Sequence, residues 1–147
     1  MADESHETIG FLLTDVARLL RQRTERAFDD AGLGLTSGEA RTLAFASRFS
    51  GLRQAALAER MSVEPMTLVG FLDRLEARGL VERVSDPCDR RAKTVHLTPA
   101  AEEIVQRFRD IARGTREVAT RDLTDADVEK LRAVLLHLRA NLTAGDS

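Results

Sequence analysis

The sequence predicts a mainly α-helical chain with one small β-hairpin. Apolar residues recur at helical spacing over most of its length, whereas two short runs rich in β-branched residues, at 80–84 and 94–97, alternate as strands do. Gly and Pro stand between these segments, where helices end or begin. Of the 147 residues, 43% are hydrophobic and 31% are charged. These values are typical of one folded helical domain with a sizeable core, so residues 1–147 are expected to form a single domain.

The first two helices are expected at about residues 8–31 and 36–49. Apolar residues at helical spacing indicate the first helix, which ends near Gly32. These apolar residues are Ile9, Leu12, Leu13, Val16, Leu19 and Leu20. Thr36 and Glu39 have the spacing of a capping box, in which each side chain bonds the other residue's backbone amide. The pair therefore predicts the start of the second helix.

A helix-turn-helix follows these two helices. Residues 53–61 favour a short helix, residues 62–64 form a tight connection, and Pro65 suits the first turn of the next helix. Gly79 is a suitable C-terminal stop for that helix. Its apolar face consists of Leu68, Leu72 and Leu75. The residues expected largely elsewhere on the helix are Thr67, Gly70, Phe71 and Arg74.

The β-branched runs predict a hairpin with a long tip. Nine residues, 85–93, separate the two runs, which is more than a tight two-residue turn requires. We therefore expect the tip to project from the body. It carries the densest positive charge of the region, in Arg90, Arg91 and Lys93.

Two further helices complete the chain. Thr98 and Pro99 have the pattern of an N-cap followed by proline in the first turn, and Thr124 begins a last helix whose first turn is acidic. The apolar stripe of the last helix consists of Val128, Leu131, Val134, Leu135, Leu138 and Leu142. The order of elements is that of a winged helix-turn-helix, at about residues 36–98, flanked by helices at about 8–31 and 99–143.

The flanking helices carry more apolar stripe than one small winged domain can cover. Burying the stripe against the same stripe of a second copy is the simplest solution, so a homodimer is expected. The residues that define this expectation are Ile9, Val16, Leu20, Val134 and Leu138.

Charge and composition exclude several classes of protein. The formal net charge is −2, which by itself argues weakly against a nucleic-acid-binding protein. The local distribution of charge matters more, and residues 53–98 hold eight Lys and Arg against seven Asp and Glu. The acidic start and the lack of a long apolar run predict a cytoplasmic protein without a membrane segment. One cysteine, Cys88, and three widely separated histidines, His6, His96 and His137, predict no disulfide and no metal. No nucleophile-base pair or phosphate loop indicates an enzyme or a cofactor.

The strongest motif lies where the helix-turn-helix meets the hairpin. The run Leu75-Glu76-Ala77-Arg78-Gly79-Leu80-Val81-Glu82-Arg83 is followed by Asp89-Arg90-Arg91-Ala92-Lys93-Thr94-Val95-His96-Leu97-Thr98. It contains an Asp-x-Arg-x-x-x-Val-x-Leu-Thr pattern and resembles the MarR (multiple-antibiotic-resistance regulator) family, within it the SlyA-like branch. The motif covers about 25 residues, and the helical order matches from about residue 9 to 142.

The resemblance implies an obligate dimer built by the terminal helices, with one winged lobe per subunit that binds double-stranded DNA. It implies that Asp89 pairs with Arg91 to brace the wing, while Arg90 lies nearest the tip. It also implies a small aromatic or amphipathic acid ligand that docks between the helical base and the winged lobe. One departure is Gly70, where relatives often carry a larger polar or basic residue.

The candidate DNA contacts lie on both helices of the helix-turn-helix and on the wing. A helix in the major groove reads base edges, and arginines of a wing suit phosphates and the narrow minor groove. The candidates are Arg53, Thr67, Gly70, Phe71, Arg74, Arg90, Arg91 and Lys93. Phe71 is either a contact to a thymine methyl or a core residue, and the wing charges are either groove contacts or a solvated loop.

Two functions are therefore compared. The leading hypothesis is a DNA-binding transcription regulator, a repressor or occasionally an activator, that a small molecule relieves. The alternative is a dimeric small-molecule sensor or protein-interaction module that has lost DNA binding, suggested by the acidic total charge and by Gly70. A redox role for Cys88, which lies near Arg90 and Arg91 in the sequence, is the weaker hypothesis, because the oxidant sensors of the family carry their cysteine in the first helix.

Overall fold

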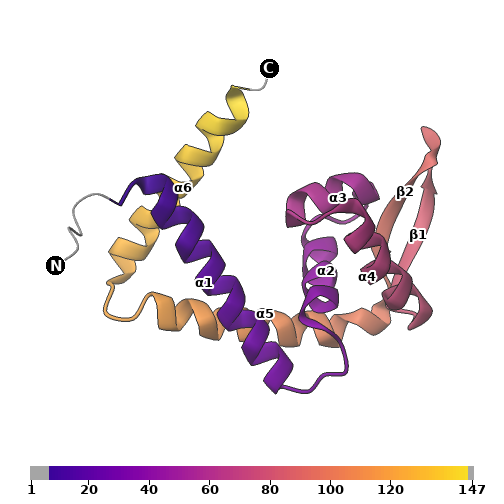
Figure 1. The fold of residues 1–147 in the computed structure, drawn as a ribbon, viewed down its shortest axis with the longest axis horizontal. Helices are drawn as coiled ribbons and strands as arrows, with labels where there is room; N and C mark the ends of the chain where they lie inside the picture. The colour runs from indigo at the N-terminus through magenta and orange to yellow at the C-terminus, as the bar shows by residue number, and fades with distance from the viewer. Residues whose placement is uncertain (1–6, 146–147) are drawn as a thin grey trace. The chain divides into compact units, whose positions relative to one another are not determined.

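The computed structural model describes residues 7–145, and the elements follow the predicted order (Figure 1). They are α1 (Ile9–Asp30), α2 (Ser37–Arg48), α3 (Gln54–Met61), α4 (Pro65–Ala77), β1 (Val81–Asp86), β2 (Asp89–Leu97), the short 3-10 turn η2 (Pro99–Ala101), α5 (Glu102–Ala119) and α6 (Asp125–Ala144). The chain divides into two compact units, Met1–Thr115 and Arg116–Ser147. The expectations for the acidic start before residue 7 and for His6 lie outside the described residues.

The predicted helix starts are confirmed by their hydrogen bonds. At the start of α2, Glu39 N donates to Thr36 Oγ1 over 3.2 Å, and Thr36 N donates to Glu39 Oε2 over 3.1 Å. A second capping box begins α6, where Asp127 and Thr124 exchange the same pair of bonds. Each box satisfies backbone amides that the first helical turn cannot pair internally, so the sequence fixes both starts locally.

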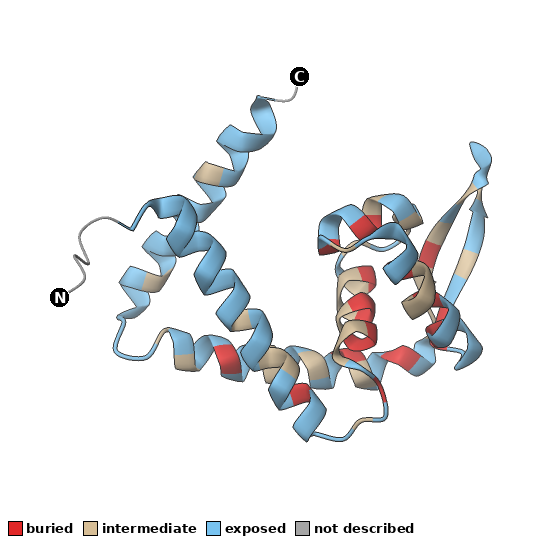
Figure 2. Ribbon diagram, viewed as in Figure 1, coloured by how far each residue is buried: buried red, intermediate tan, exposed pale blue. Residues whose placement is uncertain are grey.

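The hydrophobic core lies within the first unit, among α2, α3, α4, the base of the hairpin and α5 (Figure 2). The predicted apolar face of α4 is confirmed, because Leu68, Leu72 and Leu75 are all fully buried. Phe28, near the end of α1, packs its ring against Phe108 of α5 with ring centroids 5.8 Å apart. The winged lobe is therefore one packed body to which α1 is attached by its C-terminal end.

The long hairpin tip predicted from the sequence is wrong. β1 and β2 extend to Asp86 and Asp89, so only Pro87 and Cys88 turn between them. The extra residues of the nine-residue segment are absorbed by an irregularity between Ser85 and Asp86, where the pairing shifts register. The pairs Ser85–Lys93 and Asp86–Asp89 continue the antiparallel ladder toward the turn, whereas residues 90–92 fall within the register shift and pair with no residue of β1.

A third segment joins the hairpin at its base. Val95 N donates to Leu52 O over 3.0 Å, and Gly51 N donates to Val95 O over 3.3 Å. The segment before α3 is thereby fixed to β2, which couples the helix-turn-helix to the hairpin. Thr98 is the N-cap residue of η2, as predicted, but its hydroxyl donates to Gly79 O over 2.5 Å instead of capping the turn.

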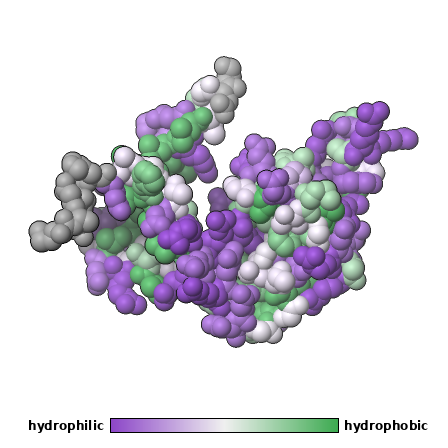
Figure 3. Space-filling model, in the orientation of Figure 1, coloured by the Kyte–Doolittle hydropathy of each residue, from purple (hydrophilic) through white to green (hydrophobic). Residues whose placement is uncertain are grey.

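Much apolar surface remains exposed outside this core. In the first unit, Ile9, Phe11 and Val16 of α1 are 69%, 75% and 51% exposed. In the second unit, no residue of α6 is buried, and its stripe includes exposed Leu131, Val134 and Leu135. Figure 3 shows hydrophobic side chains on the face of α6 that is turned toward the viewer. Between residues 7 and 145, these side chains thus leave a large part of their apolar surface in contact with water.

Candidate nucleic-acid interface

α4 presents one face to solvent because its opposite face is buried. The connection from α3 turns sharply at Ser62, which has the left-handed φ of 53°, and Pro65 begins α4. This geometry leaves the first turn of α4 open, so Met66 is 76% exposed and Thr67 is also exposed. Met66 is not among the contacts predicted from the sequence, although an apolar residue that lies off the buried face of such a helix could have indicated it.

Phe71 is a packing residue as well as a candidate contact. Its half-buried ring lies against Gly38 of α2, so closely that a β-carbon there would overlap the ring. Gly70 is half-buried on the same helix. The inner surface of the Phe71 ring is therefore occupied by α2, and a contact of its outer part with DNA stays a prediction.

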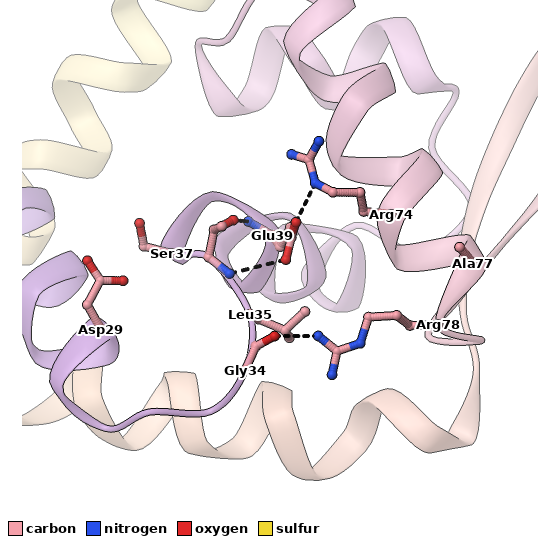
Figure 4. A pocket seen from close by; sticks show the side chains of 9 residues that line it. Asp29, Gly34, Leu35, Ser37, Glu39, Arg74, Ala77 and Arg78 are labelled. Carbon is pink, nitrogen blue, oxygen red and sulfur yellow. Dashed lines mark hydrogen bonds and ion pairs between the residues drawn. The ribbon is translucent and has the colours of Figure 1, made fainter.

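Arg74 is held in place by a carboxylate from another helix. Its Nε donates to Glu39 Oε1 over 2.6 Å, and its guanidinium carbon lies 5.6 Å from the centre of the Phe71 ring. Glu39 is buried, with 6% of its side chain exposed, whereas Arg74 is 56% exposed. Figure 4 shows the two terminal nitrogens of Arg74 turned away from Glu39. The sequence identified Glu39 as a helix cap but gave no sign of this second role.

The wing, defined as residues 81–97, is braced differently from the prediction. Asp89 accepts only the backbone amide of Arg91, over 3.1 Å, and within residues 7–145 it forms no ion pair with the Arg91 guanidinium. The tie runs instead from Asp86 to Arg53, whose Nε donates to Asp86 Oδ2 over 2.6 Å. Asp89 thus contacts Arg91 through the backbone amide alone, the ion pair that ties the wing to the segment before α3 comes from Asp86, and a bracing role for Asp89 stays a prediction.

The wing cations differ in whether another side chain of the protein binds them. Lys93 Nζ donates to Ser85 Oγ over 2.9 Å, across the hairpin. Arg90 and Arg91 are exposed, and among the described residues neither forms an ion pair with a carboxylate. Arg53 is engaged by Asp86, so its use on a phosphate requires that this pair open. Arg90 and Arg91 are thus the wing charges best placed to meet a polyanion.

A second ion pair ties the wing to α4. Arg83 of β1 donates through Nε to Glu76 Oε2 over 3.1 Å and through its terminal nitrogen to Asp73 Oδ1 over 2.7 Å. The hydrogen bond from Arg83 lowers the pKa of Glu76, and the Glu76 hydrogen bond raises the pKa of Arg83. The wing is therefore held to α4 by Arg83 of β1 and to the start of α3 by Asp86.

The contact between Asp86 and Arg53 also shifts the pKa of both groups. The pKa of Asp86 lies below its ordinary value because the Cys88 backbone amide and then Arg53 donate hydrogen bonds to the carboxylate. The pKa of Arg53 is raised, chiefly by the hydrogen bond to Asp86. Both shifts favour the charged pair at neutral pH.

Other classes of site receive no support from the described part of the chain. Between residues 7 and 145, no group of three or more His, Cys, Asp or Glu side chains could hold a metal ion. In that range no helix is long and apolar enough to cross a membrane. Cys88 is exposed at the wing turn.

The exposed α4, the helix-turn-helix that carries it and the cationic wing define a DNA-binding transcription regulator of the winged-helix class. The family model for MarR matches residues 35–93, which cover α2 to the middle of β2. The winged helix-turn-helix of this chain is therefore similar to that of the MarR family.

Solved structures are similar to this chain over nearly its whole length. A MarR-family regulator from Silicibacter pomeroyi has 29% identity and a TM-score of 0.77, with 90% of this chain and 88% of that chain covered. A structure of MarR has 26% identity and a TM-score of 0.80 over 100% of both chains. CouR from Rhodococcus jostii RHA1, bound to p-coumaroyl-CoA, has 25% identity and a TM-score of 0.71, with 90% of this chain and 91% of that chain covered.

More distant structures share the fold alone. A MarR-family protein from Listeria monocytogenes complexed with 26mer DNA has 18% identity and a TM-score of 0.77, over 95% of this chain and 92% of that chain. SlyA has 22% identity and a TM-score of 0.74, over 95% and 96%. The placement of this chain in the SlyA-like branch stays a prediction.

Proposed function

We propose that this protein is a homodimeric repressor that binds a near-palindromic operator and is released by a small molecule. The observation that carries the proposal is the apolar surface that α1 and α6 each leave exposed, while the winged lobe has a complete core of its own. A second copy would remove these stripes from water, and each buried Leu or Val contributes about 1.5–3 kcal/mol. Two-fold symmetry then requires two half-sites, about one helical turn apart.

The proposed contacts divide between the two grooves. α4 would enter the major groove with Met66, Thr67 and the neighbouring Gly70 nearest the base edges. The wing would place Arg90 and Arg91 beside the adjacent minor groove, where arginine is favoured.

A small aromatic or amphipathic acid is the proposed ligand. Support comes from CouR, a relative of 25% identity whose structure holds p-coumaroyl-CoA. In a dimer, a ligand that changes the distance between the two recognition helices weakens binding to half-sites of fixed spacing. A panel of phenolic acids and their CoA thioesters, screened by thermal melting and operator affinity, tests this part. No shift in either measurement with any member would contradict it.

The dimer is tested by a matched pair of substitutions. Val134 of α6 and Val84 of the wing are both 48% exposed, so Val134→Asp and Val84→Asp change equally exposed side chains of the same type. Sedimentation at micromolar concentration should give twice the 16.3 kDa chain mass for the wild type and for Val84→Asp, and a monomer for Val134→Asp. A wild type that sediments only as a monomer contradicts the dimer.

DNA binding is tested by footprinting on the DNA that flanks the protein's own coding region. A dyad footprint is expected, and affinity should fall about 10³–10⁵-fold between 50 and 200 mM salt if about 6–10 phosphates are contacted.

One observation favours the alternative, a sensor or interaction module: Arg53 and Arg74 are both paired with carboxylates. That alternative predicts no salt-dependent DNA binding at all.

A further inference from the structure

Arg74 is confined on three sides in the structure. Glu39 accepts from its Nε, and the Phe71 ring lies under its guanidinium. The third side is Gly70, where a β-carbon would lie 3.6 Å from Arg74 Nη1. Helical side chains tilt toward the N-terminus, so Arg74 lies back over the turn that contains Gly70. The guanidinium of Arg74 therefore lies beside Gly70, at the distance of an ordinary van der Waals contact from a β-carbon there.

Glu39 is a rigid anchor for this arrangement. Its Oε2 accepts the backbone amide of Thr36, which fixes the carboxylate to the first turn of α2, and its Oε1 accepts from Arg74. Both oxygens are thus engaged, and the side chain is almost completely buried. A buried carboxylate held by the backbone has little freedom to follow a moving arginine. The orientation of the guanidinium is set by α2.

We propose that Glu39 is a positioning residue that presents the outer edge of Arg74 to a guanine of the operator. This inference rests on the proposed function. Nε is used by Glu39, and the two terminal nitrogens point away from it (Figure 4). Two parallel donors match O6 and N7 of guanine in the major groove. Phosphate also accepts two donors, but the adjacent carboxylate offsets the charge of Arg74, which favours the neutral base over the phosphate.

The arrangement also reduces the entropy cost of the contact. A free arginine loses side-chain freedom when it binds, whereas Arg74 is already held at its Nε and stacked on Phe71. Removing the anchor should therefore weaken discrimination at one base pair even if the charge of Arg74 remains.

The test compares base preferences of variants on an operator selected with the wild-type protein. Arg74→Ala should lose about 5- to 150-fold in affinity per half-site, and the preference for guanine should vanish at one position only. Glu39→Gln should relax the same position. The double variant should bind no more weakly than Arg74→Ala, because Glu39 acts through Arg74. Arg78→Ala is the control: it removes an equal charge, next to the end of α4, and should leave the base profile unchanged.

Three results would overturn the proposal. If Arg74→Ala weakens binding to all sequences equally and reduces the salt slope by about one, Arg74 contacts a phosphate instead. If the losses of Glu39→Gln and Arg74→Ala simply add, Glu39 acts only through folding. Arg74→Lys keeps Glu39 and the positive charge but lacks the two parallel terminal donors of the guanidinium. If this variant keeps the full preference for guanine, the two parallel donors are not used. This last variant decides the question even where Glu39→Gln fails to fold.

Failure of the proposed function gives a different result from failure of this inference. A wild type without salt-dependent DNA binding contradicts the regulator itself, because no operator can then be selected. A wild type that binds a dyad operator, with variants that leave every base preference intact, contradicts only the role of Glu39 and Arg74.

Discussion

Replacing Gly38 by Ala should destabilise this protein, although alanine is the better helix former. Gly38 lies in the first turn of α2, and a β-carbon there would lie 2.8 Å from Phe71 Cε1, 3.1 Å from Cε2 and still closer to Cζ. The half-buried ring must move outward, and such overpacking costs about 1–3 kcal/mol. In a helix, alanine is more stabilising than glycine by about 0.5–1 kcal/mol. The expected net loss is about 1 kcal/mol in the free energy of unfolding, from the difference of these terms.

The assay is urea unfolding of four proteins at one concentration: the wild type, Gly38→Ala, Phe71→Ala and the double variant. Without the ring, only the helix preference remains, so Gly38→Ala should stabilise the Phe71→Ala background by about 0.5–1 kcal/mol. The effect of one substitution therefore changes sign between the two backgrounds. Equal stabilisation by Gly38→Ala in both backgrounds would refute the contact between α2 and the recognition helix.

Four other predictions concern the wing and α4. Arg90→Ala should weaken operator binding by about 1–3 kcal/mol per half-site with unchanged folding. Asp86→Ala should weaken it more than Asp89→Ala because only Asp86 ties the wing to Arg53, and a larger loss from Asp89→Ala would contradict this brace. An NMR titration should place the pKa of Asp86 below its ordinary value, so its contribution to stability is full above that value and is lost as pH falls through the lowered pKa. Arg53→Ala should raise this pKa only partly, because the backbone amide at the wing turn still donates. Gly70→Ala should stabilise the protein by about 0.5–1 kcal/mol, measured by urea unfolding, because its β-carbon meets Arg74 only at an ordinary contact distance.

The sequence by itself determined the elements and their order. Each depends on residues close together in the chain: the capping boxes at Thr36 and Thr124 fix helix starts, and the spacing of Leu68, Leu72 and Leu75 fixes the buried face of α4. The family motif at the wing is equally local, and the match to the MarR family model reaches residue 93 within it. Hydrogen bonds and apolar spacing within a few residues need no knowledge of the rest of the fold.

The tertiary structure alone decided which charged groups meet. Asp89 and Asp86 both lie near the wing turn in sequence, but the register of the strands brings Asp86, not Asp89, to an arginine side chain, Arg53. Glu39 and Arg74 are 35 residues apart, and their contact exists only because α2 packs against α4 through Gly38 and Phe71. An ion pair acts over a few ångströms and depends on strand register and helix packing, which local sequence patterns do not encode.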